Sequence, residues 1–97
     1  MNIFICTAFI LSQPKLKKVK NQNFCYMLLS LNNHHNKLSN IRVRAFARSK
    51  VAKKIFDLYK EKNKVIIESS IYTKKLLLGN YKKKSEIYIK IHKINDI

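Results

Sequence analysis

The chain has 97 residues, enough for one small domain, and its 21 Lys and Arg against 5 Asp and Glu give a formal net charge of +16. This charge indicates a polyanionic partner, because a compact monomer of such charge density would repel itself. The composition also excludes a glycine-rich phosphate-binding loop, since the chain has one glycine, and it leaves few acids for acid–base catalysis or a hard-metal site.

The first 40 residues predict an irregular N-terminal extension that holds two apolar segments. The first segment, residues 3–11, is too short to cross a bilayer as a helix, which takes about 20 residues. We interpret it as the start of a strand or helix buried against a partner, with a membrane-associating segment as the alternative. A basic link, residues 12–23, leads to the second segment, residues 24–31, whose length favours a strand over a buried helix. The Asn-rich residues 32–40 predict a loop.

Cysteine and histidine do not form a metal-binding pattern. Cys6 and Cys25 lie 19 positions apart in apolar runs, which predicts two buried free thiols. His34 and His35 are adjacent, so their side chains point in different directions, and they fit a polar loop better than a metal site.

Residues 41–97 predict the folded domain. Residues 41–47 alternate between small apolar residues and Arg42, Arg44 and Phe46, the pattern of a strand with one basic face. The period then changes to three and four over residues 51–59, which predicts an amphipathic helix capped by Ser49 and ended near Asn63.

The remaining residues predict short strands and a basic turn. Residues 65–67, 71–72 and 76–78 are apolar or β-branched and lead to a turn at Gly79-Asn80. Residues 81–85 are a basic connector, and residues 86–92 return to strict alternation. The expected fold is therefore α+β, a small split β-α-β (ferredoxin-like) sheet with one helix. Its expected core is Ile41, Val43, Val51, Ile55, Leu58, Ile66, Ile87, Ile89 and Ile91.

The order of these elements resembles the universal small-subunit ribosomal protein ten, the S-ten family, over residues 41–97. The strand Ile41-Arg42-Val43-Arg44-Ala45-Phe46 is similar to the one that opens the family's domain. Ile71-Tyr72-Thr73 occupies the place of its aromatic-Thr pair, and Lys83-Lys84-Ser85-Glu86 through His92-Lys93 looks like its last matching strand. The chain departs from the family in three ways: it lacks the Gly/Pro-rich loop after the helix, it has Leu76-Leu77-Leu78 in the hairpin, and it ends before the family's second helix and last strand.

This resemblance implies a structural constituent of the small ribosomal subunit, in its head region. The implied partners are rRNA and neighbouring small-subunit ribosomal proteins, with no catalysis, cofactor, metal, small-molecule substrate or membrane. Because the sheet would otherwise have an open edge beside residues 41–47, we predict that residues 24–31 pair antiparallel with that strand. The competing idea is that a separate chain supplies the missing helix and strand.

Basic and aromatic side chains are the candidate site residues. Cations neutralise phosphates and position RNA without reading its sequence, and tyrosines stack on unpaired bases. The predicted RNA-binding residues are Arg42, Arg44, Arg48, Lys82, Lys83, Lys84, Lys90, His92 and Lys93. The tyrosines predicted to stack are Tyr72, Tyr81 and Tyr88, for which ordinary sheet packing is the alternative; for each lysine the alternative is a solvated surface.

The composition also predicts a location. Lys occurs 18 times, Ile 13 and Asn 10 against 3 Arg, which indicates an AT-rich genome. We expect a protein of the mitochondrial matrix and ribosome, encoded in the organelle, with the plastid as second choice. A small basic membrane-associated subunit of an organellar complex and a free nucleic-acid-binding module are the alternative functions.

Overall fold

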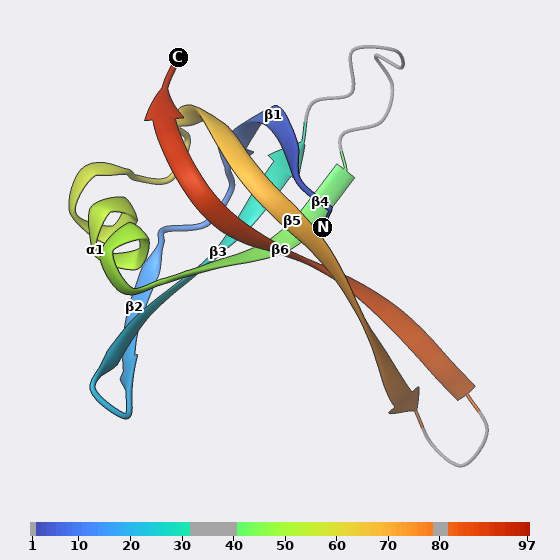
Figure 1. Ribbon diagram of the computed structural model, residues 1–97. Helices are drawn as coiled ribbons and strands as arrows, with labels where there is room; N and C mark the ends of the chain where they lie inside the picture. Colours follow the sequence, from blue (N-terminus) through green and yellow to red (C-terminus); the bar gives the residue numbers. More distant parts are fainter. Residues whose placement is uncertain (1, 32–40, 79–81) are drawn as a thin grey trace.

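Six strands and one helix make up the part of the chain that the computed structural model describes, residues 2–31, 41–78 and 82–97, with the side chains of 74–78 and 82–85 outside that description. The elements are β1 (Phe4–Ile10), β2 (Lys15–Val19), β3 (Gln22–Leu31), β4 (Ile41–Arg48), α1 (Ser49–Leu58), β5 (Lys64–Leu78) and β6 (Lys82–Asp96) (Figure 1). The predicted loop at 32–40 and the predicted turn at Gly79-Asn80 lie outside the described residues.

The strands close into a barrel. The sheet order is β1-β5-β6-β4-β3-β2, and β1 also pairs with β3, so that β1, β5, β6, β4 and β3 form a ring and β2 extends β3. Strand β1 pairs with β5 from Phe4↔Ser69 to Phe9↔Lys64, and its last residues also pair with β3, from Ala8↔Leu31 to Ile10↔Leu29. The pairing of β4 with β6 is parallel, and the others are antiparallel. Closure pairs strand edges that an open sheet would expose.

The predicted split β-α-β fold with an irregular N-terminal extension is therefore wrong. Residues before 41 supply three of the six strands, and two of those, β1 and β3, complete the ring. The basic link, residues 12–23, was not expected to form a strand, but it contains β2, whose residues pair with β3 from Lys15↔Tyr26 to Val19↔Gln22. The predicted antiparallel pairing of residues 24–31 with residues 41–47 is confirmed by the register from Phe24↔Arg48 to Leu31↔Ile41.

Two hairpins project from the barrel (Figure 1). In β2–β3 the two turn residues, Lys20 and Asn21, have φ of 48° and 64°, the left-handed pair that a two-residue type I′ turn requires. In β5–β6 the ladder runs from Val65↔Asp96 to Leu78↔Lys82, where we expected short apolar segments over residues 65–78, a basic connector at 81–85 and a strand at 86–92. Cross-strand pairing carries both strands through residues that are not strand-like by themselves, such as Ser69.

Helix α1 lies where the sequence predicts it, but its ends differ. Its N-cap is Arg48, which makes no side-chain cap bond, whereas the Oγ of Ser49 accepts a hydrogen bond of 3.0 Å from Gln22 Nε2. The left-handed residue after the helix is Lys62 (φ 75°), and Asn63 instead accepts a bond of 2.7 Å from the Lys60 N–H through its Oδ1. Among the described residues, no helix is long and apolar enough to span a membrane.

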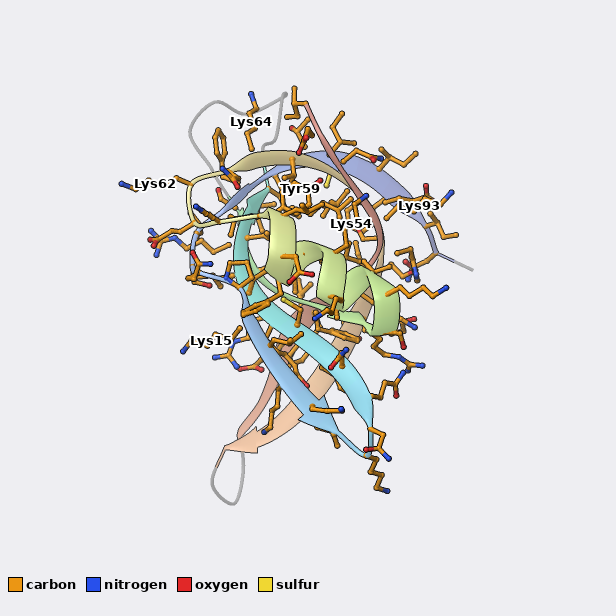
Figure 2. The ribbon with its side chains drawn as sticks, turned by 90° about the vertical axis from the view of Figure 1, so that its left-hand side faces the viewer. Lys15, Lys54, Tyr59, Lys62, Lys64 and Lys93 are labelled. Atoms are coloured by element: carbon orange, nitrogen blue, oxygen red, sulfur yellow. The ribbon has the colours of Figure 1, made fainter. Side chains whose placement is uncertain are left out.

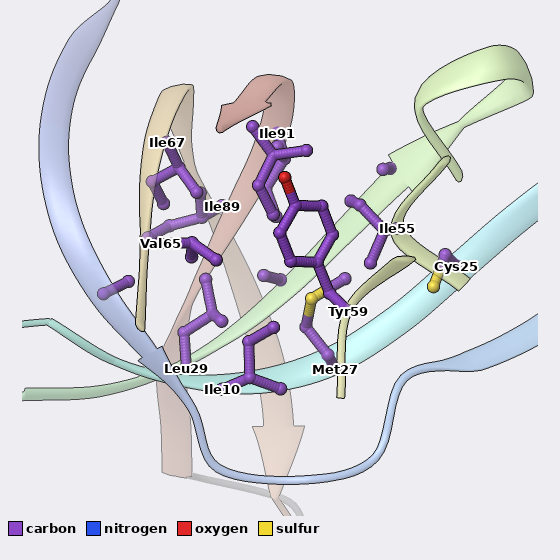
Figure 3. Packing of buried hydrophobic residues seen from close by; sticks show 14 of the residues in the cluster. Ile10, Cys25, Met27, Leu29, Ile55, Tyr59, Val65, Ile67, Ile89 and Ile91 are labelled. Atoms are coloured by element: carbon purple, nitrogen blue, oxygen red, sulfur yellow. The ribbon is translucent and has the colours of Figure 1, made fainter. Parts of the chain in front are cut away.

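The core fills the barrel and the space beneath α1 (Figure 3). Of the nine residues predicted for it, Val43, Ile55, Ile89 and Ile91 are buried, whereas Ile41, Leu58 and Ile87 are 46%, 63% and 49% exposed. Several large aliphatic side chains that the predicted core lacks are fully buried, largely on the strands that close the ring; they are Ile10, Leu29, Val65, Ile67 and Ile94. A three-stranded sheet with one helix would have left them without a partner.

Candidate nucleic-acid interface

Alternation along β3 and β4 separates the core from an outer face. In β3, Cys25, Met27 and Leu29 are buried, so Phe24 and Tyr26 point to the other side of the sheet. In β4 the buried residues are Val43, Ala45 and Ala47, and the alternating residues on the outer face are Arg42, Arg44, Phe46 and Arg48.

The strand register aligns these residues in rows across the sheet. One row runs Lys15↔Tyr26↔Phe46↔Lys90↔Ser70, from β2 through β3, β4 and β6 to β5. The neighbouring row runs Leu28↔Arg44↔Tyr88↔Tyr72. Directly opposed residues lie about 5 Å apart, so each ring in these rows has a cation or another ring beside it.

Five aromatic and five basic side chains therefore share one surface, which we call the aromatic–basic face. Its members are Phe24, Tyr26, Phe46, Tyr72, Tyr88, Lys15, Arg42, Arg44, Arg48 and Lys90. Figure 2 shows Lys15 on β2, away from Lys54 and Lys93 beside α1.

Two adjoining hollows lie on this face. The first, of about 610 Å³, is lined by Lys15 and Arg44 among others, and the second, of about 560 Å³, by Arg48 and Lys90 among others. Both are lined by Tyr26, Phe46 and Tyr88, so the hollows form one path.

The rings are available to a ligand. Tyr26 and Tyr72 are 45% and 48% exposed, so a ligand can reach the ring of each. The rings of Phe24 and Tyr26 lie 6.3 Å apart between centroids at an interplanar angle of 17°. Flat, exposed rings at this spacing are suited to stacking on unpaired bases.

One acid lies at this face. The Tyr88 hydroxyl donates a 2.6 Å hydrogen bond to Oε2 of Glu86, and Arg44 Nη1 lies 3.8 Å from the same oxygen. The bond to the Glu86 carboxylate raises the pKa of Tyr88, with Arg44 acting in the opposite direction. None of the five acids of the chain lines either hollow; Glu86 lies beside them through its contacts with Tyr88 and Arg44.

The structure brings together six of the predicted site residues: Arg42, Arg44, Arg48, Lys90, Tyr72 and Tyr88. It places His92 and Lys93 in a separate hollow of about 200 Å³ beside α1, lined also by Val51 and Lys54. The ladder pairs Ser69 with Ile91 and Glu68 with Lys93, which leaves His92 as an extra residue that interrupts the strict alternation. His92 Nε2 lies 2.7 Å from Ser70 Oγ. Tyr81 lies outside the described residues, as do the side chains of Lys82, Lys83 and Lys84.

Sequence reasoning missed four members of the face: Phe24, Tyr26, Phe46 and Lys15. The alternation of Phe24 and Tyr26 with Cys25 and Met27 is visible in the sequence and indicates that the two rings share a side. It does not show that this side is open, because that depends on which face the helix and the barrel interior cover.

Both cysteines are free thiols. Cys25 is buried at the helix end of β3, and burial raises its pKa to about 11. Cys6 is half-buried on β1, and burial raises its pKa as well. Neither thiol lines the hollows of the aromatic–basic face.

No family model and no curated protein matches the sequence. The structure, however, is similar to that of a small single-stranded DNA-binding protein from Streptomyces coelicolor, with a TM-score of 0.82 at 8% identity over 98% of this chain and 93% of that one. The single-stranded DNA-binding domain of a Synechococcus protein gives 0.77 at 14% identity over 97% and 93%. The second single-stranded DNA-binding protein of Mycobacterium smegmatis gives 0.78 at 13% identity over 98% and 87%.

These similarities show the fold. A five-stranded closed barrel with a helix between its third and fourth ring strands is the OB fold. The resemblance to the S-ten family is therefore wrong, and with it the expectation of a ribosomal protein, because the whole chain superimposes on single-stranded DNA-binding domains. The Ile-Lys and Ile-Arg alternation that carried the resemblance belongs to barrel strands in both regions, β4 and β6.

Proposed function

We propose that this chain binds single-stranded nucleic acid on the aromatic–basic face, and that single-stranded DNA is its ligand. The observation that carries the proposal is the continuous path of two hollows, in which five exposed or half-buried rings lie beside four cations. The likeness to three single-stranded DNA-binding proteins supports it, since their fold presents a comparable sheet.

The chemistry of the face favours a single strand over a duplex. In a duplex the flat surfaces of the bases are stacked on one another, so the rings of Tyr26 and Tyr72 would have no free base to contact. An unpaired strand offers both its bases and its phosphates, and rings alternating with cations bind both at once. Stacking accepts every base, so we expect weak sequence preference.

The mechanism is binding without a chemical step. Phosphates are neutralised by Lys15, Arg44, Arg48 and Lys90, which releases condensed counterions and makes the affinity fall with salt. The prediction that the chain is not an enzyme stays a prediction, and the partners proposed are nucleic acids only. The organellar location also stays a proposal, and it is supported by the Lys, Ile and Asn composition.

Fluorescence anisotropy with a labelled oligothymidylate tests the proposal. The strand should have about 20 nucleotides, since one OB fold covers about 4–16. Tyr26→Ala and Tyr72→Ala should each weaken binding by about 5- to 150-fold, the range for the loss of one base–ring stack of about 1–3 kcal/mol. Phe56→Ala is the matched control, because Phe56 is an aromatic residue of similar exposure, 43%, on α1 away from the hollows.

Competition experiments identify the ligand. Unlabelled single-stranded DNA should displace the probe at lower concentration than a duplex of the same length. The stacking argument would be contradicted if the duplex displaced the probe at the same concentration as the single strand. It would also be contradicted if Phe56→Ala bound the probe as weakly as Tyr72→Ala. If single-stranded RNA competed more strongly than single-stranded DNA, the aromatic–basic face would still be the binding site, but RNA would be the ligand.

A further inference from the structure

Glu86 is the acidic member of an otherwise cationic surface. It lies on β6 two residues before Tyr88, and it lines another hollow of the same face, of about 300 Å³, together with Arg42, Arg44 and Leu28. Its carboxylate lies among arginines and therefore reduces the positive charge that the face presents to a phosphate. It is one of only five acids in the chain.

Two of the contacts of Glu86 are to groups that the proposed function uses. Its Oε2 accepts the hydrogen bond from the Tyr88 hydroxyl at 2.6 Å and lies 3.8 Å from Arg44 Nη1. Arg44 is 68% exposed at its side chain, whereas Glu86 is 21% exposed. The guanidinium is therefore free to turn toward an incoming anion, and the carboxylate stays in place against the sheet.

A phosphate oxygen and a carboxylate oxygen offer the same chemistry to a guanidinium: a negative charge and a hydrogen-bond acceptor. We propose that Glu86 is an internal competitor for the nucleic acid, which holds Arg44 and Tyr88 in the free protein and gives up Arg44 to a phosphate when a strand binds. This inference rests on the proposed function and adds to it a residue that limits the affinity of the face.

The exchange of Glu86 for a phosphate at Arg44 costs little free energy, and it leaves the strand bound less tightly. An exposed ion pair contributes little, so a phosphate can replace Glu86 at Arg44 without a large penalty. After the exchange, the carboxylate remains close to the bound strand and opposes it. Binding is thus weaker than the cations alone would make it, which favours release and movement along a strand.

The test compares Glu86→Gln with Asp57→Asn. Both substitutions remove one negative charge and keep the shape of the side chain, but Asp57 is exposed on α1 and lines neither the two hollows of the path nor the hollow beside Glu86. With the oligothymidylate of the previous experiment, Glu86→Gln should bind about two- to fivefold more tightly at low salt, the range for one surface ion pair. The slope of log affinity against log salt should steepen by up to about 0.7, because the wild-type carboxylate, once it has given up Arg44, attracts a cation from solution and so offsets one released counterion. Asp57→Asn should change neither quantity.

A third variant shows whether Arg44 is the group in competition. In an Arg44→Gln background, the gain from Glu86→Gln should shrink to the part that comes from direct repulsion between the carboxylate and the strand. Any of three results would overturn the inference. The gain in affinity from Glu86→Gln could persist undiminished in this background, it could equal the change caused by Asp57→Asn, or Glu86→Gln could bind the oligothymidylate more weakly than the wild type. Far-ultraviolet circular dichroism of each variant confirms that it keeps the fold. Wild-type protein that binds no single strand would overturn the proposed function itself, whereas wild-type binding with an inert Glu86→Gln would overturn only the role of Glu86.

Discussion

Replacing Ile10 by Ala tests whether the N-terminal residues are part of the barrel. Ile10 is the last residue of β1 and is 0% exposed. It pairs with Leu29 on β3, its N–H donates a 3.0 Å bond to the Asn63 carbonyl, and its own carbonyl accepts a 2.7 Å bond from the Lys62 N–H. The substitution keeps these backbone bonds and removes only the buried side chain.

The expected loss follows from burial. Ile→Ala removes three carbons at about 0.8 kcal/mol for each buried CH₂, and the cavity left behind adds to this, for a total of about 2–5 kcal/mol. Ile5→Ala is the matched control, because Ile5 is on the same strand and 69% exposed. Its loss should stay within about 1 kcal/mol, the span of strand propensity.

Urea unfolding followed by tyrosine fluorescence and circular dichroism measures both variants. The free energy of unfolding should fall more for Ile10→Ala than for Ile5→Ala, with the same dependence on urea concentration for both. If Ile10→Ala leaves no folded protein, Ile10→Val should still cost about 0.5–1.5 kcal/mol. Equal losses at the two positions would refute the closed barrel and favour an N-terminal extension outside the core.

Two further predictions concern thiols and phosphate contacts. Cys25, with its pKa raised to about 11, should react with iodoacetamide at pH 8 at least about a hundredfold more slowly in the folded chain than in urea, because the thiolate is the reactive form. Equal rates in both conditions, followed by mass spectrometry, would contradict the burial of this strand. Arg48→Gln should lower the salt slope of oligothymidylate binding by about 0.7, and Lys93→Gln, in the separate hollow beside α1, should leave it unchanged. If Lys93→Gln lowered the salt slope more than Arg48→Gln did, the bound nucleic acid would have to run along the α1 side of the barrel instead.

The sequence alone was sufficient for part of the local structure and for one long-range pairing. The length of the apolar run favoured a strand at residues 24–31, and period-two alternation identified residues 41–47 and 86–92 as strands. The change of period identified α1, because these signals depend on side chains a few positions apart. The pairing of residues 24–31 with residues 41–47 was predictable because two strands joined by a short connection usually lie side by side. The net charge likewise pointed to a polyanion without any structure.

Only the tertiary structure decided the architecture and the site. Alternation shows which side chains share a face, but not which strand lies beside it, so nothing local indicated that β1 pairs with both β5 and β3 and closes a ring. The extra residue His92 changes the alternation of β6 within a strand that looks regular in sequence, which separates His92 and Lys93 from Lys90. Tyr26 and Tyr72 are 46 positions apart, and they share one hollow because β3, β4, β6 and β5 are neighbours in the sheet. A site built across strands is defined by their order and register, and both are set by the packing of the whole barrel.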